Sequence, residues 1–135
     1  MIDNALLNAS VSELHQLLTD RQVSSAELTR GYLERIELLN GKLNAVVTVC
    51  AEQAIEDAGR ADERLTRGES NILTGIPLLH KDIFCTQGVT TTCGSRMLEH
   101  FVPAYAATVV GRLKAAGVVR LGKCNMDEFA MGSSN

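Results

Sequence analysis

At the N-terminal end of the chain, hydrophobic residues recur at helical spacing behind two capping signals. Ser10-Val-Ser-Glu13 and Ser24-Ser-Ala-Glu27 each have the pattern of a capping box, in which a serine and a glutamate three residues later bond each other's backbone N–H groups. Apolar residues follow each box: Leu14, Leu17 and Leu18 behind the first, and Leu28, Tyr32, Leu33, Ile36 and Leu39 behind the second. The pattern predicts two helices, of which the second ends at Asn40-Gly41.

A strand and a third helix are predicted next. Residues 45–50 are rich in β-branched side chains, which favours a strand. Residues 51–67 return to helical spacing, with charges on the outer face and small or aliphatic residues on the other: Ala54, Ile55, Ala58, Ala61 and Leu65. Gly68 then gives a helix stop signal.

The second half of the chain has the pattern of an α/β unit. Residues 75–83 form a short apolar run that ends on charge, and residues 86–94 are rich in glycine, threonine and cysteine, as in a loop. A helix is predicted over residues 107–116, closed by Gly117, and a strand over residues 118–122. Strand, helix and strand with short connections favour parallel pairing. The predicted fold class is therefore α/β, with the N-terminal helices packed on a mixed, largely parallel sheet.

Composition narrows the class of protein without fixing its function. Hydrophobic residues make up 45% and charged residues 21% of the 135 positions, which is a globular profile and fits one domain. The formal net charge is −3, and no cluster of Lys or Arg stands out. We therefore do not expect this segment to hold nucleic-acid phosphates by itself, although these charges are compatible with a nucleic acid held by another subunit.

The cysteines and the N-terminus indicate a reducing compartment. The four cysteines, at positions 50, 85, 93 and 124, contain no Cys-x-x-Cys pair and no closely spaced histidine, so no metal site is predicted. Residues 1–4 lack the basic and apolar parts of a signal peptide. The longest apolar run, residues 45–51, is too short to span a bilayer. We predict a cytoplasmic protein with four free thiols and no membrane span.

Lys81 is the most informative candidate for chemistry. Alternation along a strand places Leu79, Lys81 and Ile83 on one face. A lysine between apolar neighbours is expected to be buried, and burial lowers the pKa of an amine and favours its neutral form. A neutral amine can accept a proton from a serine hydroxyl, directly or through a relay. The alternative, which the general preference of lysines for the surface favours, is a strand-end lysine that lies in solvent or pairs with Asp82.

The remaining polar candidates have simpler explanations. His80 points to the face opposite Lys81, where a lone histidine is usually a hydrogen-bonded structural residue. Asp127 and Glu128 are adjacent and diverge on a helix, so helix-start charges explain them better than a metal site. The run Gly132-Ser133-Ser134 is predicted as a loop, because no strand-to-helix turn follows it in this chain.

A set of short motifs, covering nearly half of the chain, occurs in one order from Gly75 onward. The motifs are Gly75-Ile-Pro with Lys81-Asp82, Thr91-Thr-Cys-Gly-Ser95, Pro103-Ala-Tyr-Ala-Ala-Thr-Val-Val110, Leu113-Lys-Ala-Ala-Gly117, Gly122-Lys-Cys-Asn125 and Met126-Asp-Glu-Phe-Ala-Met-Gly132. Each motif is weakly specific, but in this order they resemble the amidase signature family, of which the helical front is also typical. The last motif resembles in particular the glutaminase branch of that family, the A subunits of glutamyl-tRNA(Gln) amidotransferases.

The resemblance implies a Ser–Ser–Lys mechanism. Lys81 occupies the position of the lysine base, and the relay serine and the nucleophilic serine are expected beyond Asn135. The run Met131-Gly132-Ser133 resembles a segment that borders the substrate in such enzymes. Two departures from the family pattern stand beside the base: His80 replaces a common aliphatic residue, and Ile83 replaces a common asparagine.

The resemblance also implies a function for the whole protein. Such a protein hydrolyses glutamine and supplies ammonia to amidotransferase subunits B and C, in a complex that converts Glu-tRNA(Gln) to Gln-tRNA(Gln). No metal or organic cofactor is implied for this subunit, because ATP and magnesium are used by the partner subunit. Two alternatives stay open: a stand-alone amidase that acts on small amides, and a non-catalytic assembly module.

The expected domain organisation is a single amidase domain of which residues 1–135 are the N-terminal part. Residues 1–70 are expected to be mainly helical, and residues 71–135 to be α/β with the catalytic lysine. The sequence ends in a Gly-Ser-Ser loop rather than a completed element, so we expect a truncated chain. Without the two serines such a fragment is expected to be inactive, and its uncovered strand edges and apolar faces favour self-association.

Overall fold

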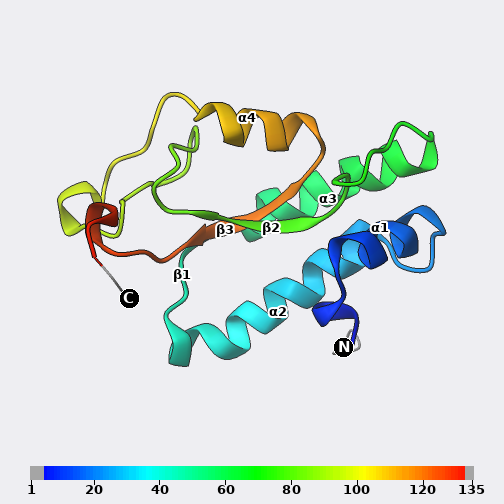
Figure 1. Cartoon of the computed structure of the whole chain (residues 1–135), viewed down its shortest axis with the longest axis horizontal. Helices are drawn as coiled ribbons and strands as arrows, with labels where there is room; N and C mark the ends of the chain where they lie inside the picture. The colour runs from blue at the N-terminus through cyan, green and yellow to red at the C-terminus, as the bar shows by residue number, and fades with distance from the viewer. Residues whose placement is uncertain (1–4, 133–135) are drawn as a thin grey trace.

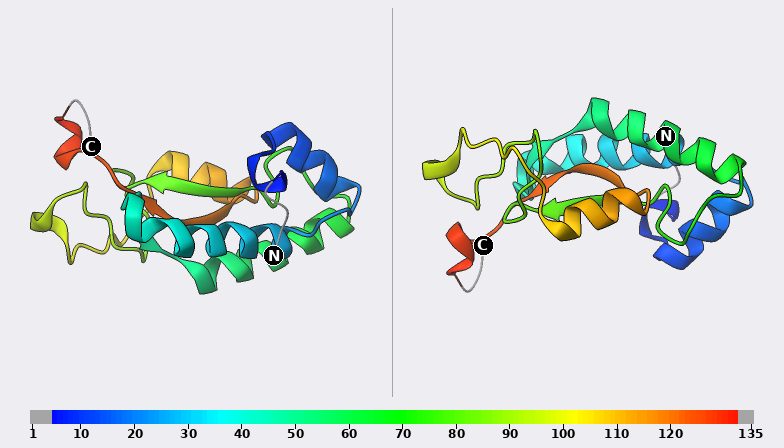
Figure 2. Two further views of the ribbon diagram at one scale, coloured as in Figure 1. Left: turned by 90° about the horizontal axis from the view of Figure 1, so that it is seen from below. Right: turned by 90° about the horizontal axis from the view of Figure 1, so that it is seen from above.

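Residues 5–132 are described by the structure, a computed structural model, as four α-helices, three strands and three short 3-10 turns. In chain order the elements are η1 (Leu6–Asn8), α1 (Val11–Thr19), α2 (Ser25–Leu43), β1 (Val46–Val49), α3 (Ala51–Thr66), β2 (Pro77–Lys81), η2 (Arg96–Leu98), α4 (Thr108–Ala115), β3 (Val119–Cys124) and η3 (Glu128–Ala130). Figures 1 and 2 show three layers, with α2 and α3 on one face of β2 and β3 and α4 on the other.

Both predicted capping boxes are confirmed. The Ser10 side chain accepts from the backbone N–H of Glu13, whose carboxylate accepts in return from the Ser10 N–H at 2.7 Å. Ser24 and Glu27 repeat the arrangement at the start of α2. In each box the hydrogen bonds from the serine lower the pKa of the glutamate. Both helix starts are therefore set by local sequence.

The predicted end of α2 at Asn40-Gly41 is wrong. The helix continues to Leu43 and ends at Asn44, which has a left-handed backbone conformation with φ of 48°. Inside the last turns, the Asn40 side chain donates to the C=O of Val46 and accepts from its N–H, both at 2.9 Å. The side chain that suggested a helix stop therefore fixes the start of β1 instead.

The sheet is mixed, with the strand order β1-β3-β2. β2 and β3 pair in parallel, from Pro77 opposite Val119 to Lys81 opposite Cys124, and α4 lies in the connection between them. β1 pairs with the other edge of β3 in the antiparallel direction. The predicted α/β class and the parallel strand–helix–strand unit are confirmed.

Along β3 the pairing with β2 shifts by one residue between Arg120 and Gly122, so that Leu121 is an extra residue. Such a bulge reverses the face to which the following side chains point. Lys123 therefore lies opposite His80. A simple alternation from Leu121 would have placed Lys123 on the other face of the sheet.

Two clusters of buried side chains hold the layers together. The first joins α1 and α2 to the residue before β2 and contains Leu14, Leu18, Leu28 and Ile76. The second lies between α3 and the sheet and contains Ala54, Ala58, Val119 and Leu121, with Leu79 packed against it. The small alanines let α3 lie close to β3, while the helical front and the α/β part share the first cluster.

Candidate active site

Lys81 is the last residue of β2 and pairs with Cys124, the last residue of β3, so it lies where both parallel strands end. Its side chain is exposed, so the prediction of a buried lysine is wrong for the part of the chain that the structure describes. The physical reason is that the strand stops there. The Phe84 N–H donates to the Lys81 C=O in a turn at 3.1 Å, and Ile83, which was expected on the same strand face, is exposed in that turn.

The buried lysine of this region is Lys123 on β3. Its ammonium donates to the C=O of Phe84 at 2.7 Å and to the Thr91 hydroxyl at 2.9 Å. The same nitrogen lies 3.4 Å from Oδ1 of Asp82, which is an ion-pair contact rather than a short hydrogen bond, and both of these side chains are fully buried. Burial lowers the pKa of Lys123, and the Asp82 carboxylate opposes this effect. The Lys123 ammonium therefore contacts three oxygen atoms, and these contacts hold it in place.

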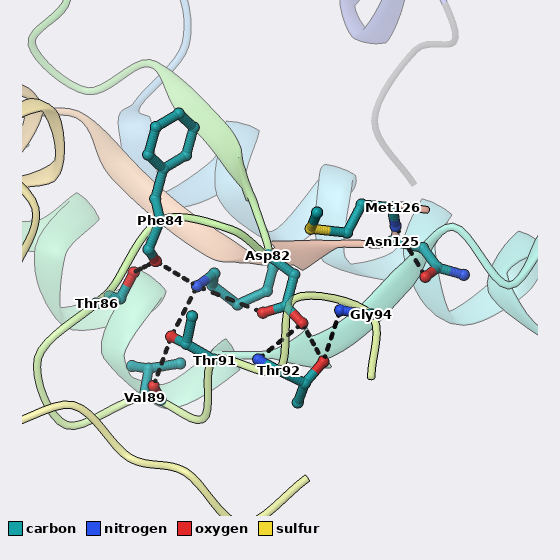
Figure 3. A network of polar contacts seen from close by, with 10 residues as sticks. Asp82, Phe84, Thr86, Val89, Thr91, Thr92, Gly94, Asn125 and Met126 are labelled. Atoms are coloured by element: carbon teal, nitrogen blue, oxygen red, sulfur yellow. Dashed lines mark hydrogen bonds and ion pairs between the residues drawn. The ribbon is translucent and has the colours of Figure 1, made fainter. Parts of the chain in front are cut away.

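The Asp82 carboxylate connects the end of β2 to the loop that follows it. Oδ2 accepts from the backbone N–H of Thr92 at 3.0 Å and from the Thr92 hydroxyl. The Asp82 C=O accepts from the N–H of Cys93 at 3.1 Å. Figure 3 shows the side-chain part of this network. The segment 91–95 is thus held against the residue that directly follows Lys81.

The same segment also contacts the chain beyond β3. The Phe129 N–H donates to the Cys93 C=O at 2.9 Å, and the Ser95 hydroxyl donates to Glu128 at 2.6 Å. Segment 91–95 therefore lies between the strand end that carries Lys81 and the turn η3, which leads to the predicted substrate-binding residues.

Of those predicted residues, Met131 is 81% exposed, and Gly132 packs against Asp127. Ser133 lies outside the described residues. Among residues 5–132 no hydrogen bond or ion pair joins Lys81 directly to Met131 or Gly132. The structure relates them through segment 91–95 rather than by contact.

His80 is buried, and neither ring nitrogen has a hydrogen-bond partner in the described part of the chain. The prediction that His80 is a hydrogen-bonded structural residue is therefore wrong as regards its hydrogen bonds, because the buried ring has none among the described residues. Burial, together with the positive charges of Arg120 and Lys123, lowers the pKa of His80 to about 4. The imidazole is neutral at pH 7 and serves as a packing residue on the same face as Lys123.

Asp127 directly precedes the short turn η3 and Glu128 begins it, but the Asp127 side chain makes no capping hydrogen bond. Over residues 5–132, no group of three or more His, Cys, Asp or Glu side chains could hold a metal ion. All four cysteines are free thiols, as predicted. No helix in the same range has the length and hydropathy needed to cross a membrane.

A groove of about 620 Å³ lies elsewhere, between α2, α3 and the end of β1. It is lined by Arg30, Leu33, Glu34, Ile36, Glu37, Asn40, Gly41, Val49, Ala51 and Ile55. None of the residues predicted for chemistry lines this groove, so it does not compete with the strand ends as the candidate site.

Sequence reasoning missed the role of Lys123 and Asp82. A signal was present, because Lys123 directly follows the strand predicted over residues 118–122 and belongs to the motif Gly122-Lys-Cys-Asn125. Its partner could not be found from spacing, since Asp82 follows another strand and the bulge changes the face of Lys123.

Comparisons with a family profile, with curated sequences and with solved structures all find amidases. The profile of the Amidase family matches residues 27–135. Curated A subunits of glutamyl-tRNA(Gln) amidotransferases are similar to the chain: that of Hahella chejuensis is 55% identical over 96% of the chain, and that of Nitrosococcus oceani is 60% identical over 93%. The chain spans only 27% and 26% of the lengths of these two relatives.

Solved structures of amidases are also similar to the chain, with lower sequence identity than the A subunits. The native peptide amidase from Stenotrophomonas maltophilia matches with a TM-score of 0.87 and 34% identity, over 94% of this chain and 27% of the other. An amidase family protein from Bacillus anthracis matches with a TM-score of 0.85 and 34% identity, over 92% of this chain and 25% of the other. The described architecture is thus a small part of the fold of these enzymes.

Proposed function

The chain belongs to the amidase family, and on that basis we propose that it is the N-terminal part of the glutamine-hydrolysing component, the A subunit, of a glutamyl-tRNA(Gln) amidotransferase. The observation that carries the proposal is the high identity of almost the whole chain to curated A subunits. The exposed position of Lys81 at the strand ends supports it, because the amine is accessible to groups from outside residues 5–132.

In the proposed reaction, the amine of Lys81 acts as the base and accepts a proton, through a relay serine, from the serine that attacks the side-chain amide carbon of glutamine. The carbon–nitrogen bond then breaks as the proton is returned to the nitrogen, which leaves as ammonia. Water hydrolyses the resulting glutamyl ester and releases glutamate and the serine. Both serines would be supplied by chain beyond Asn135, and Met131-Gly132-Ser133 would border the glutamine.

The proposal includes partners. Subunits B and C would receive the ammonia and convert Glu-tRNA(Gln) to Gln-tRNA(Gln), with ATP and magnesium bound by the partner rather than by this subunit. The acidic balance of the chain, with a net charge of −3, supports a division in which another subunit holds the tRNA. Such a reaction belongs in the cytoplasm.

A second candidate is a stand-alone amidase for small amides or peptide amides. The structural similarity to the peptide amidase favours it, although the curated A subunits are more similar in sequence. The two candidates differ in one measurable respect: an amidotransferase component depends on its partner subunits and charged tRNA for full glutaminase activity, and a stand-alone amidase does not.

The test is glutamine hydrolysis by the full-length protein assembled with its partner subunits. Lys81→Ala is expected to lower kcat by roughly 10²–10⁴-fold, because the nucleophile loses its base. Lys114→Ala, at an exposed position of α4, is the matched control and should retain wild-type kcat. If Lys81→Ala keeps more than about a tenth of wild-type kcat, Lys81 is not the base.

Two further measurements separate the candidates. Turnover of small amides without partners, at a rate equal to that in the complex, would favour the stand-alone amidase. The 135-residue chain alone is expected to be inactive, since no acyl-enzyme can form without the nucleophile. Glutamine turnover by that chain would contradict the proposed location of the serines.

A further inference from the structure

We propose that Lys123 is a positioning residue of the active site. Its buried ammonium holds the Asp82 carboxylate and segment 91–95, and through them it sets the position of the Lys81 strand end relative to the segment that ends in Met131-Gly132. The inference rests on the proposed function, because it assigns Lys81 the role of the base.

The first step is that Lys123 carries a positive charge in a buried position, where desolvation of the charge is unfavourable. An ammonium without exposure to water must be compensated by oxygen partners. Lys123 has three: the Asp82 carboxylate, the Phe84 C=O and the Thr91 hydroxyl. All three belong to the chain just after β2, so the side chain of one strand determines the path of the loop that follows its neighbour.

The second step concerns Lys81 itself. Within residues 5–132 its ammonium has no hydrogen bond or ion pair, so the backbone of β2 sets where the residue begins and no side-chain partner holds it. The next residue along that backbone is Asp82, whose N–H donates to the Cys124 C=O at 3.1 Å and whose carboxylate is paired with Lys123. The pair therefore anchors the strand directly after the proposed base.

The third step connects this anchor to the proposed substrate segment. Cys93 donates its N–H to the Asp82 C=O and accepts with its own C=O from the N–H of Phe129. Cys93 and Gly94 both have positive φ, at 52° and 67°, and a Cβ at Gly94 would lie 2.6 Å from the C=O of Met126. The loop thus fits closely between the two strand ends, and its position depends on Asp82 and Lys123.

The experiment uses the full-length protein in its complex, with glutamine as substrate. Thr91→Val removes the hydroxyl that accepts from Lys123 but keeps the shape of the side chain, and Thr91→Ser keeps the hydroxyl. Lys123→Met removes the ammonium, and Lys114→Met on exposed α4 is the matched control. Each variant is assayed at a temperature at which circular dichroism shows that it is fully folded.

We expect Lys123→Met and Thr91→Val to lower kcat by about 10-fold or more with KM changed by less than about three-fold, because a misplaced base slows the chemical step. Thr91→Ser and Lys114→Met should stay near wild type. A purely structural role would move the unfolding temperature without this separation of kcat from KM. Wild-type kcat in folded Lys123→Met and Thr91→Val would overturn the inference.

The variants distinguish a failure of the positioning role of Lys123 from a failure of the proposed function. If Lys81→Ala is inactive while Thr91→Val and Lys123→Met are normal, only the positioning role fails. If Lys81→Ala is active, the proposed base fails, and the positioning role fails with it. Should Lys123→Met not fold, the comparison of Thr91→Val with Thr91→Ser decides the question alone.

Discussion

The Lys123 ammonium and the Asp82 carboxylate lie 3.4 Å apart, and neither side chain is exposed to solvent. Two buried charges that compensate each other contribute little net stability compared with neutral groups of similar size, but removal of one leaves the other unpaired. This asymmetry makes the pair testable in the 135-residue chain.

Lys123→Met is expected to destabilise the chain by about 3–5 kcal/mol, because Asp82 then stays buried without its cation. The double variant Lys123→Met/Asp82→Asn should recover much of this loss. The measurement is urea unfolding of both variants and of Asp82→Asn, analysed as a double-mutant cycle. An equal loss in the single and double variants would show that packing, and not charge, explains the effect.

His80 predicts a dependence of stability on pH. Burial keeps its imidazole neutral in the folded chain and lowers its pKa to about 4, whereas an unfolded chain binds the proton near pH 6.5. As the pH falls below 6.5, the unfolded state therefore gains protons that the folded state does not, and stability decreases until about pH 4. The total effect is at most about 3 kcal/mol.

The check is the free energy of unfolding measured between pH 7 and pH 5 for wild type and for His80→Leu. The leucine variant should lose most of the slope in this range. Glu13 and Glu27 have lowered pKa values and contribute only at more acidic pH. An unchanged slope in His80→Leu would mean that another group titrates.

Gly122 is predicted to be intolerant of substitution. A Cβ at this position would lie 2.0 Å from the Thr48 C=O on β1, so Gly122→Ala must move the two strands apart and should cost about 3 kcal/mol. Gly111 in α4 is the matched control, because a Cβ there meets nothing within 4 Å. Gly111→Ala should stabilise by about 0.5–1 kcal/mol through helix propensity. Thermal unfolding of both variants distinguishes the two cases.

The free thiols can be counted directly. All four cysteines are unpaired in the structure, so thiol titration of denatured, unreduced protein should give four per chain. A count of two or zero would indicate disulfides and would remove the argument for a reducing compartment.

The sequence predicted the features that depend on neighbouring residues. The Ser10 and Ser24 capping boxes specify helix starts within four residues, and strand–helix–strand order specifies the parallel pair. Features that depend on distant residues were not predictable in this way. Asn40 looked like a helix stop, yet its partner is Val46 across the following turn.

The candidate site shows the same limit. The motif around Lys81 indicated the position of the proposed base, but not its exposure, because exposure depends on where β2 ends and on what covers its edge. The buried lysine that organises the site was hidden for a different reason. Its face and its partner depend on the pairing register between strands, which alternation along one strand does not contain.

The extra residue in β3 has a consequence for how this segment can vary in evolution. Before Leu121 the strand is in one phase of alternation, and after it the phase is inverted, so that apolar side chains meet the alanines of α3 and Lys123 meets Asp82. Deleting Leu121 would remove the bulge and restore simple alternation, with Arg120 still opposite Leu78 and Lys123 still opposite His80, but it would remove one buried side chain from the cluster with Ala54 and Ala58. Between Val119 and Lys123 the chain can therefore lose one residue and keep the cation on its present face, and the cost of that loss is a smaller apolar contact with α3.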